Sequence, residues 1–227
     1  IIDMIILISG GFVVIGEVVF PALIVPIIDS LFNNFSTPLK QSLRVFIGYC
    51  SMTIGPLLII RYQLMGLVSS GKDGGWLQWN VKPIRDGILK SINGWLMIMP
   101  LVLLTGWVMN EIFGDQGGSN PLLELVLNSD ELIPLLFLLL TTVVLAPVFE
   151  ELVFRGILLP VLVSKVGKIS GVLLSALIFA LAHLSVGELP PLFVLGIGLG
   201  LMRLSSGRLF PCALMHSLWN GFTFASL

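Results

Sequence analysis

The sequence predicts an all-α protein, a multi-pass transmembrane helical bundle with about seven membrane-spanning helices. Of its 227 residues, 56% are hydrophobic and only 11% are charged, whereas an average soluble domain is about 25% charged. Uncharged stretches recur at about the length of a bilayer crossing, roughly 20 residues for a helix. The ten-residue apolar/polar alternation of membrane β-strands is absent.

The charge balance narrows the classes of partner. The chain has 12 Lys and Arg residues against 13 Asp and Glu residues, which leaves a net charge of −1. A nucleic-acid binder needs an excess of basic residues to neutralise phosphates, so no nucleic-acid partner is predicted. The same composition excludes a disordered chain and a disulfide scaffold. The lipid bilayer is the partner that the composition predicts.

Each predicted span is a stretch with few charges. Four stretches are long enough to cross a bilayer without any charge, and three shorter ones reach that length if their ends snorkel or the helices tilt. Glu17 is the one charge inside the first stretch. In chain order the seven predicted spans are 4–28, 45–60, 91–110, 132–149, 169–187, 189–202 and 209–227.

The loops between these spans predict the orientation, because Lys and Arg collect on the cytoplasmic side. Acidic loops without Lys or Arg follow the third and fifth spans, and they contain Glu111, Asp115, Glu124, Asp130, Glu131 and Glu188. The basic loops follow the second, fourth and sixth spans, and they contain Arg61, Lys72, Lys82, Arg85, Lys90, Lys165, Lys168, Arg203 and Arg208. The N-terminus is therefore predicted inside, with Lys40 and Arg44 of the first loop as exceptions.

Ionisable residues within a span are candidates for function, because each costs at least about 2.5–3.5 kcal/mol on insertion scales. Glu151 and Arg155 are four residues apart in the favourable acid-first order, so they are predicted to pair on one helix face. Glu150 has no partner at i+3 or i+4, which leaves it free to act as a general base. The alternative is that all three residues form a solvated helix end.

The two histidines of the chain also fall inside predicted spans. Phe179 and His183 are four residues apart, as are His216 and Asn220, so each pair is predicted to share a helix face. At 1.5 Å per residue these groups and Glu150 meet near mid-membrane, provided that the fourth helix continues past Arg155. The alternative is that each histidine is a hydrogen-bonded packing residue.

A carboxylate, two imidazoles and an amide in one dry pocket suit hydrolysis of a peptide bond. A carboxylate and an imidazole can hold and deprotonate water, and a second imidazole and an amide can donate to an oxyanion. Glu150, His183 and His216 could instead bind zinc with one position open, although no HExxH motif is present. A serine triad is disfavoured because no serine has a GxSxG context.

Three motifs in order, Glu150-Glu151-x3-Arg155, Phe179-x3-His183 and His216-x3-Asn220, resemble the signature of the CPBP family of intramembrane proteases. This family includes the type II CAAX prenyl endopeptidases and bacteriocin-immunity proteins. The resemblance covers residues 132–224, and the run 145–160 looks most like the cyanobacterial and plastid branch.

The resemblance implies a role for each motif residue. Glu150 would be the water-activating base with His183 as its partner, and His216 and Asn220 would form the oxyanion hole. Glu151 and Arg155 would be a structural ion pair, with Phe179 as motif support. The family's metal dependence is disputed, so no cofactor is assigned, and zinc on Glu150, His183 and His216 stays an alternative.

We therefore expect a glutamate-dependent intramembrane endopeptidase that cleaves a membrane-associated protein or peptide. Residues 1–130 would hold transmembrane helices without catalytic motifs and 131–227 the protease core, together forming one structural domain. One alternative is a non-proteolytic relative that binds, stabilises or helps to assemble other membrane proteins, for example in a photosynthetic membrane complex. A third hypothesis is a proton-coupled transporter with Glu17 and Glu150 as relay groups. The expected location is a cyanobacterial or plastid membrane, thylakoid or envelope, or otherwise a bacterial inner membrane.

Overall fold

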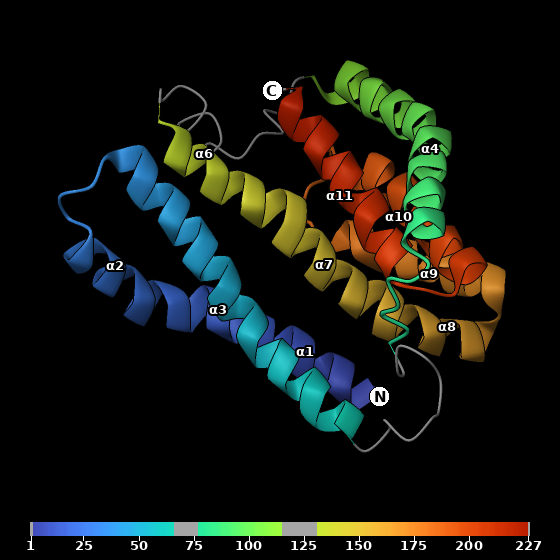
Figure 1. Ribbon diagram of the computed structural model, residues 1–227, viewed down its shortest axis with the longest axis horizontal. Helices are drawn as coiled ribbons and strands as arrows, with labels where there is room; N and C mark the ends of the chain where they lie inside the picture. The colour runs from blue at the N-terminus through green and yellow to red at the C-terminus, as the bar shows by residue number, and fades with distance from the viewer. Residues whose placement is uncertain (1, 66–76, 115–130, 227) are drawn as a thin grey trace. The chain divides into compact units, whose positions relative to one another are not determined.

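The computed structural model describes residues 2–65, 77–114 and 131–226, and all regular structure in these ranges is helical (Figure 1). Contacts divide the chain into two compact units. The first unit comprises Ile1–Ser70 and Ser119–Ala146, and the second comprises Gly71–Gly118 and Pro147–Leu227. The predicted boundary at residue 130 and the prediction of one structural domain stay predictions.

The first unit packs two long helical runs through small residues. One run is formed by α1 (Ile2–Val14), η1 (Ile15–Ile24) and α2 (Val25–Leu31), and it contacts α3 (Thr37–Met65). A Cβ atom on Gly48 of α3 would lie 2.8 Å from the ring of Phe20, and one on Gly16 would lie 2.5 Å from Met52. Glycine at these positions therefore permits the close approach of the two runs.

The third helical run of this unit, α6 (Leu132–Leu139) and η3 (Leu140–Leu145), packs on α3. The rings of Phe46 and Phe137 lie 5.2 Å apart between α3 and α6. Arg44 of α3 forms an ion pair with Asp29 of α2. This pairing neutralises Arg44, one of the two basic residues that the loop rule placed on the wrong side of the membrane.

The second unit is built around α10, which contacts α4, α9 and α11 (Figure 1). A buried apolar cluster of this unit, which includes Val102, Leu195 and Met215, lies between α4, α10 and α11. The helices of this unit are α4 (Ile84–Phe113), α7 (Ala146–Glu151), η4 (Leu152–Leu158), α8 (Leu159–Val166), α9 (Lys168–Leu181), α10 (Leu189–Ser206) and α11 (Phe210–Ala225).

The glycines of α10 explain how this helix packs on two sides at once. A Cβ atom on Gly196 would lie 3.0 Å from the Cα atom of Ala176 in α9, and one on Gly200 would lie 3.1 Å from Val172. A Cβ atom on Gly198 would instead lie 2.8 Å from Ile98 in α4. The Gly-x-Gly-x-Gly pattern thus serves helix packing on both faces.

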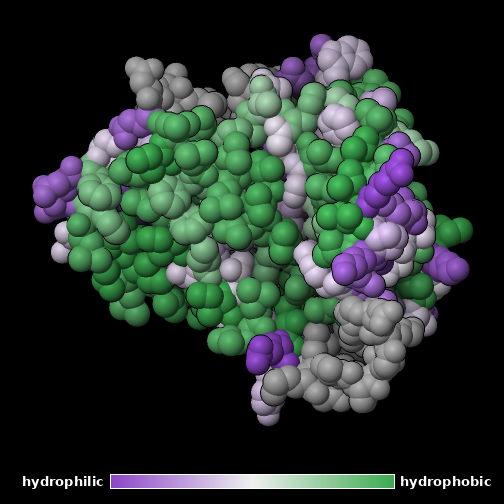
Figure 2. Space-filling model, viewed as in Figure 1, coloured by the Kyte–Doolittle hydropathy of each residue, from purple (hydrophilic) through white to green (hydrophobic). Residues whose placement is uncertain are grey.

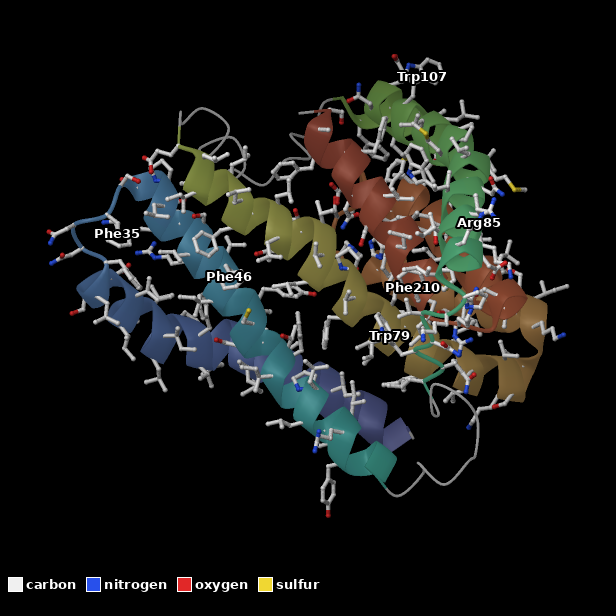
Figure 3. All side chains as sticks on the ribbon, in the orientation of Figure 1. Phe35, Phe46, Trp79, Arg85, Trp107 and Phe210 are labelled. Atoms are coloured by element: carbon white, nitrogen blue, oxygen red, sulfur yellow. The ribbon has the colours of Figure 1, made fainter. Side chains whose placement is uncertain are left out.

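Two of the predicted cytoplasmic loops meet in the second unit. Arg208, between α10 and α11, forms an ion pair with Asp86 near the start of α4. The adjacent Leu209 N–H donates to the carbonyl oxygen of Gln78 at 3.1 Å. Figure 3 labels Arg85 and Phe210 where α4 and α11 begin. These contacts agree with the orientation rule, which placed both loops on one side.

Some of the residues that support the predicted orientation lie outside the described part of the chain. They are Lys72 and the acidic residues Asp115, Glu124 and Asp130.

Five helical segments within the described residues are long and apolar enough to span a membrane. Figure 2 shows hydrophobic residues over much of the visible surface, as expected of helices that face lipid. The fifth and seventh predicted spans correspond to α9 with 14 residues and α11 with 16, so the count of about seven stays a prediction. The five segments are Gly10–Leu31, Thr37–Tyr62, Ile84–Phe113, Leu132–Val166 and Leu189–Ser206.

Two predicted span ends are wrong. The fourth span was predicted to end at residue 149, but its helix continues to Val166. Glu151 and Arg155 neutralise each other inside it, and Pro160 lies in the first turn of α8, where proline is tolerated. The fifth span was predicted to reach residue 187, but α9 ends at Leu181.

Candidate active site

The second unit contains all residues of the three motifs. Glu150 and Glu151 end α7, and Arg155 lies in the π-helical segment η4 that follows directly. Phe179 lies in the last turn of α9, and His183 lies in the turn after this helix. The third motif, His216 and Asn220, lies on α11. Residues that are separated by up to 70 positions in the sequence are thus placed in one packed unit.

Glu151 and Arg155 form a fully buried ion pair. The Arg155 Nη1 atom donates to Glu151 Oε1 at 2.8 Å, and both side chains are 0% exposed. The Arg155 Nη2 atom also donates to the Gly196 carbonyl oxygen at 3.2 Å. Its guanidinium carbon lies 4.4 Å from the ring centroid of Phe179, a cation–π contact. One arginine therefore connects η4 with α9 and α10.

Glu151 has a second partner that the sequence did not indicate. The Nδ1 atom of His216 lies 3.0 Å from Glu151 Oε1, the same oxygen that accepts from Arg155. Since a carboxylate that pairs with arginine only accepts, Nδ1 of His216 carries the proton. The bond spans 65 sequence positions, so no local spacing could have predicted it.

His183 lies in the turn after α9 and not, as predicted, on a face of that helix. The chain leaves the helix at Ala182, and Leu184 adopts a left-handed conformation with φ 55°. The Nδ1 atom of His183 lies 2.8 Å from the carbonyl oxygen of Phe179, which can only accept, so Nδ1 is the protonated nitrogen. The side chain thereby satisfies a carbonyl in the last helical turn and directs Nε2 away from the helix.

The Nε2 atoms of both histidines converge on Glu150. Oε2 of Glu150 lies 3.8 Å from Nε2 of His216 and 4.0 Å from Nε2 of His183. This oxygen is buried and has no hydrogen-bond partner among the described residues. Both distances are too long for a direct hydrogen bond and suit one bridging water molecule. The three groups can therefore hold water beside a carboxylate.

Two of the three side chains that surround Glu150 Oε2 are partly accessible. The side chains of Glu150 and His183 are 23% and 30% exposed, whereas that of His216 is 3% exposed. The ring of Phe179 contacts both imidazoles edge-on, with centroids 4.8 Å from His183 and 5.7 Å from His216. Phe179 is itself fully buried, so it supports both rings from the packed interior. The sequence had assigned this residue only as motif support.

Asn220 lies one helical turn after His216 on α11 and is half-buried. Its position is compatible with a site shared with His216, and its part in an oxyanion hole stays a prediction. The side chain of Glu17 lies outside the part of the chain that the structure describes, so the relay between Glu17 and Glu150 also stays a hypothesis.

Zinc binding was predicted as an alternative use of Glu150, His183 and His216. Within the described ranges, no three His, Cys, Asp or Glu side chains are grouped as a metal site. Ligands of one tetrahedral zinc ion, bound at about 2.0–2.2 Å, would also lie closer together than the 3.8 and 4.0 Å found here. Zinc binding by these three residues stays a prediction.

Comparisons with known proteins support the family resemblance. Residues 132–222 match the family model described as type II CAAX prenyl endopeptidase Rce1-like. The chain is 29% identical over 153 residues to the membrane-embedded CAAX protease MroQ of Staphylococcus aureus (strain USA300). This alignment covers 64% of the chain and 61% of that relative. No solved structure matches the chain at a significant level. The part of the chain that carries the candidate site is therefore similar to CAAX-type membrane proteases.

Proposed function

We propose that the protein is an intramembrane endopeptidase in which Glu150 and His183 activate water to hydrolyse a peptide bond. The observation that carries this proposal is the position of Glu150 Oε2, 3.8 and 4.0 Å from two imidazole nitrogens. This spacing suits water held by a carboxylate and two rings, and water so held is oriented before it reacts.

The first step is attack by water on the carbonyl carbon of the substrate. Glu150 accepts a proton from the water as the new carbon–oxygen bond forms. Nε2 of His183 carries a lone pair, because its proton is on Nδ1, so this nitrogen accepts the second hydrogen bond of the water. His183 therefore aims the water, while Glu150 takes its proton.

The second step is collapse of the tetrahedral intermediate. His216 can donate to the oxyanion from Nε2 only as the imidazolium, since Nδ1 already carries a proton. Glu151 accepts from Nδ1 and orients the ring, the negative oxyanion balances the charge of the imidazolium, and the Asn220 amide is the second donor. The proton on Glu150 then passes to the leaving amine as the carbon–nitrogen bond breaks, which restores the carboxylate.

The substrate class follows from the surroundings of the site. A site in a chain with several membrane-spanning helices suits a membrane-associated protein or peptide, and MroQ is named as a membrane-embedded CAAX protease. A prenylated cysteine is not required by the proposed chemistry. We also propose about seven spans with a cytoplasmic N-terminus, in a cyanobacterial or plastid membrane or a bacterial inner membrane.

The decisive experiment replaces Glu150 with glutamine in the full chain, reconstituted in liposomes with membrane proteins as substrates. New N-termini, quantified by mass spectrometry, should fall about 10²–10⁴-fold relative to the wild type, the usual contribution of general acid–base catalysis. Glu188→Gln, a change of the same charge in the turn before α10, is the matched control and should cleave normally. The helical circular dichroism of all three proteins should be equal.

Equal cleavage by wild type and Glu150→Gln would refute the proposal. If neither protein cleaves and both complement a deletion strain, the non-proteolytic alternative replaces it. In that case the function depends on binding or stabilising another membrane protein.

A further inference from the structure

The helix that carries the first motif changes its hydrogen-bond pattern directly after Glu151. Leu152–Leu158 form the π-helical segment η4, in which an N–H donates to the carbonyl oxygen five residues earlier. At the end of this segment, the N–H of Leu159 donates to the Phe154 carbonyl oxygen. Wide turns of this kind are rare and often mark functional sites, so we followed each backbone group at the junction of η4 and α8.

The carbonyl oxygen of Arg155 is left without its usual backbone donor at this junction. In an α-helix it would accept from the N–H of Leu159, but that N–H donates to Phe154 instead. A continued π-helix would pair it with residue 160, which is proline and has no N–H. Since Arg155 is fully buried, its carbonyl oxygen needs a donor from another element.

Arg203 of α10 supplies that donor. Its Nε atom donates to the Arg155 carbonyl oxygen at 3.2 Å. The same helix also binds the side chain of Arg155, because the Gly196 carbonyl oxygen accepts from Nη2 at 3.2 Å. Gly196 and Arg203 are seven residues apart, so they lie two turns apart on one face of α10. This face therefore holds both the main chain and the side chain of Arg155.

Arg155 in turn supports the residues of the candidate site. Its Nη1 atom donates to Glu151 Oε1 at 2.8 Å, and the same oxygen lies 3.0 Å from Nδ1 of His216. A shift of the Arg155 main chain would move its guanidinium and, with it, this carboxylate. Three hydrogen bonds in series thus connect the side chain of Arg203 to the imidazole of His216.

We propose that Arg203 is a positioning residue for His216 and acts through the Arg155 carbonyl. It fixes the junction of η4 and α8, where Pro160 removes the backbone donor, and so keeps Glu151 within reach of Nδ1 of His216. Its consequence for cleavage rests on the proposed function, whereas its effect on His216 does not.

The first test separates the hydrogen bond of Arg203 from its charge. Arg203→Gln and Arg203→Met both remove the charge. Glutamine places an amide nitrogen at the same number of bonds from the main chain as Nε, whereas methionine places a methyl group there. On a substrate from the liposome assay, Arg203→Met should lower kcat about 10²-fold with KM unchanged, as a small displacement of catalytic groups does. Arg203→Gln should stay close to the wild type.

The matched control is Arg85→Met, the same substitution at an exposed arginine in the first turn of α4, and it should cleave normally. Equal kcat values of Arg203→Gln and Arg203→Met would overturn the inference, because the hydrogen bond would then not matter.

A second variant adds the missing backbone donor. Pro160→Ala gives residue 160 an N–H that continues the π-helical series to the Arg155 carbonyl oxygen, which has two lone pairs. In this background Arg203→Met should lose much less kcat than it does alone. An equal loss in both backgrounds would mean that Arg203 acts elsewhere than on this carbonyl.

A readout without cleavage keeps this inference separate from the proposed function. The chain has two histidines, so isotopic labelling of histidine nitrogens in the full chain gives NMR signals from His183 and His216 alone. Arg203→Met should shift the Nδ1–H signal of His216, and Pro160→Ala should restore it. The signal of His183 should not move, since its Nδ1 atom bonds the Phe179 carbonyl.

The two failures are then distinguishable. If these shifts appear but the wild type cleaves nothing, the proposed function fails and the positioning role of Arg203 stands. If the His216 signal is the same in Arg203→Met and the wild type, the positioning role fails whether or not the protein cleaves.

Discussion

The buried carboxylate of Glu151 is predicted to stabilise the fold and to orient His216, and these two roles can be separated. Replacing Arg155 with methionine leaves Glu151 as a buried charge without a counter-charge, and replacing Glu151 with glutamine does the same to Arg155. Removal of one partner of a buried ion pair costs about 3–5 kcal/mol in the free energy of unfolding. The double variant removes both charges, so its loss should be smaller than the sum of the two single losses.

The assay is a double-mutant cycle on reversible unfolding in mixed micelles, measured by circular dichroism. Both side chains are 0% exposed and 2.8 Å apart, so the coupling free energy should exceed about 1 kcal/mol. Cleavage should respond differently, because both variants that carry Glu151→Gln lose the negative charge that favours the imidazolium form of His216. Their turnover should fall about 10²–10³-fold, the effect of losing one oxyanion donor, and the double variant should not recover it.

Two results would refute this reasoning. Additive losses of stability would mean that the pair does not interact, whatever its distance. Full turnover in the Glu151→Gln/Arg155→Met double variant would mean that His216 does not need the negative charge of Glu151.

Three further predictions test other parts of the structure. Gly196→Ala should lower the free energy of unfolding by about 1–3 kcal/mol, because the new Cβ atom would meet the backbone of Ala176. The control Gly106→Ala, which has open space around it, should change the free energy of unfolding by less than about 0.5 kcal/mol. Equal effects of the two variants would contradict the packing of α10. In His183→Asn, the side-chain amide can still reach the Phe179 carbonyl, so the unfolding midpoint should not change. Turnover should fall by at least about 10²-fold. Normal cleavage by this variant would exclude His183 from the mechanism. Treatment with the chelator 1,10-phenanthroline should leave turnover unchanged, and elemental mass spectrometry should find less than one zinc ion per chain. If zinc is stoichiometric and its removal abolishes cleavage, a zinc-dependent mechanism replaces the proposed one.

Local spacing in the sequence was enough to predict some contacts of the site. The i, i+4 separation of Glu151 and Arg155 predicted their ion pair, because four residues make one helical turn in either an α- or a slightly wider helix. The uncharged stretches predicted where helices lie, since a bilayer tolerates few charges over about 20 residues. Each of these features depends only on residues within a single helix.

Features that depend on two elements were not predictable in the same way. The bond from His216 to Glu151 requires the packing of α11 on α7, and no spacing encodes that. The end of α9 was missed because residues 182–187 carry no charge, so hydropathy alone extended the helix past Leu181. The turn that follows matters for the site, because it brings the imidazole of His183 back to the Phe179 carbonyl.

Adjacent glutamates therefore serve opposite purposes because a helix rotates about 100° per residue. Glu151 faces the packed interior, where one oxygen already accepts from Arg155 and His216 and the side chain is 0% exposed. A proton taken up by Glu151 would leave the buried Arg155 without a counter-charge. Glu150 faces the two imidazole Nε2 atoms, is 23% exposed, and forms no ion pair with an arginine or lysine in the described part of the chain. Only this second carboxylate can accept a proton from water without breaking the ion pair between Glu151 and Arg155, whose other partners lie on α9, α10 and α11.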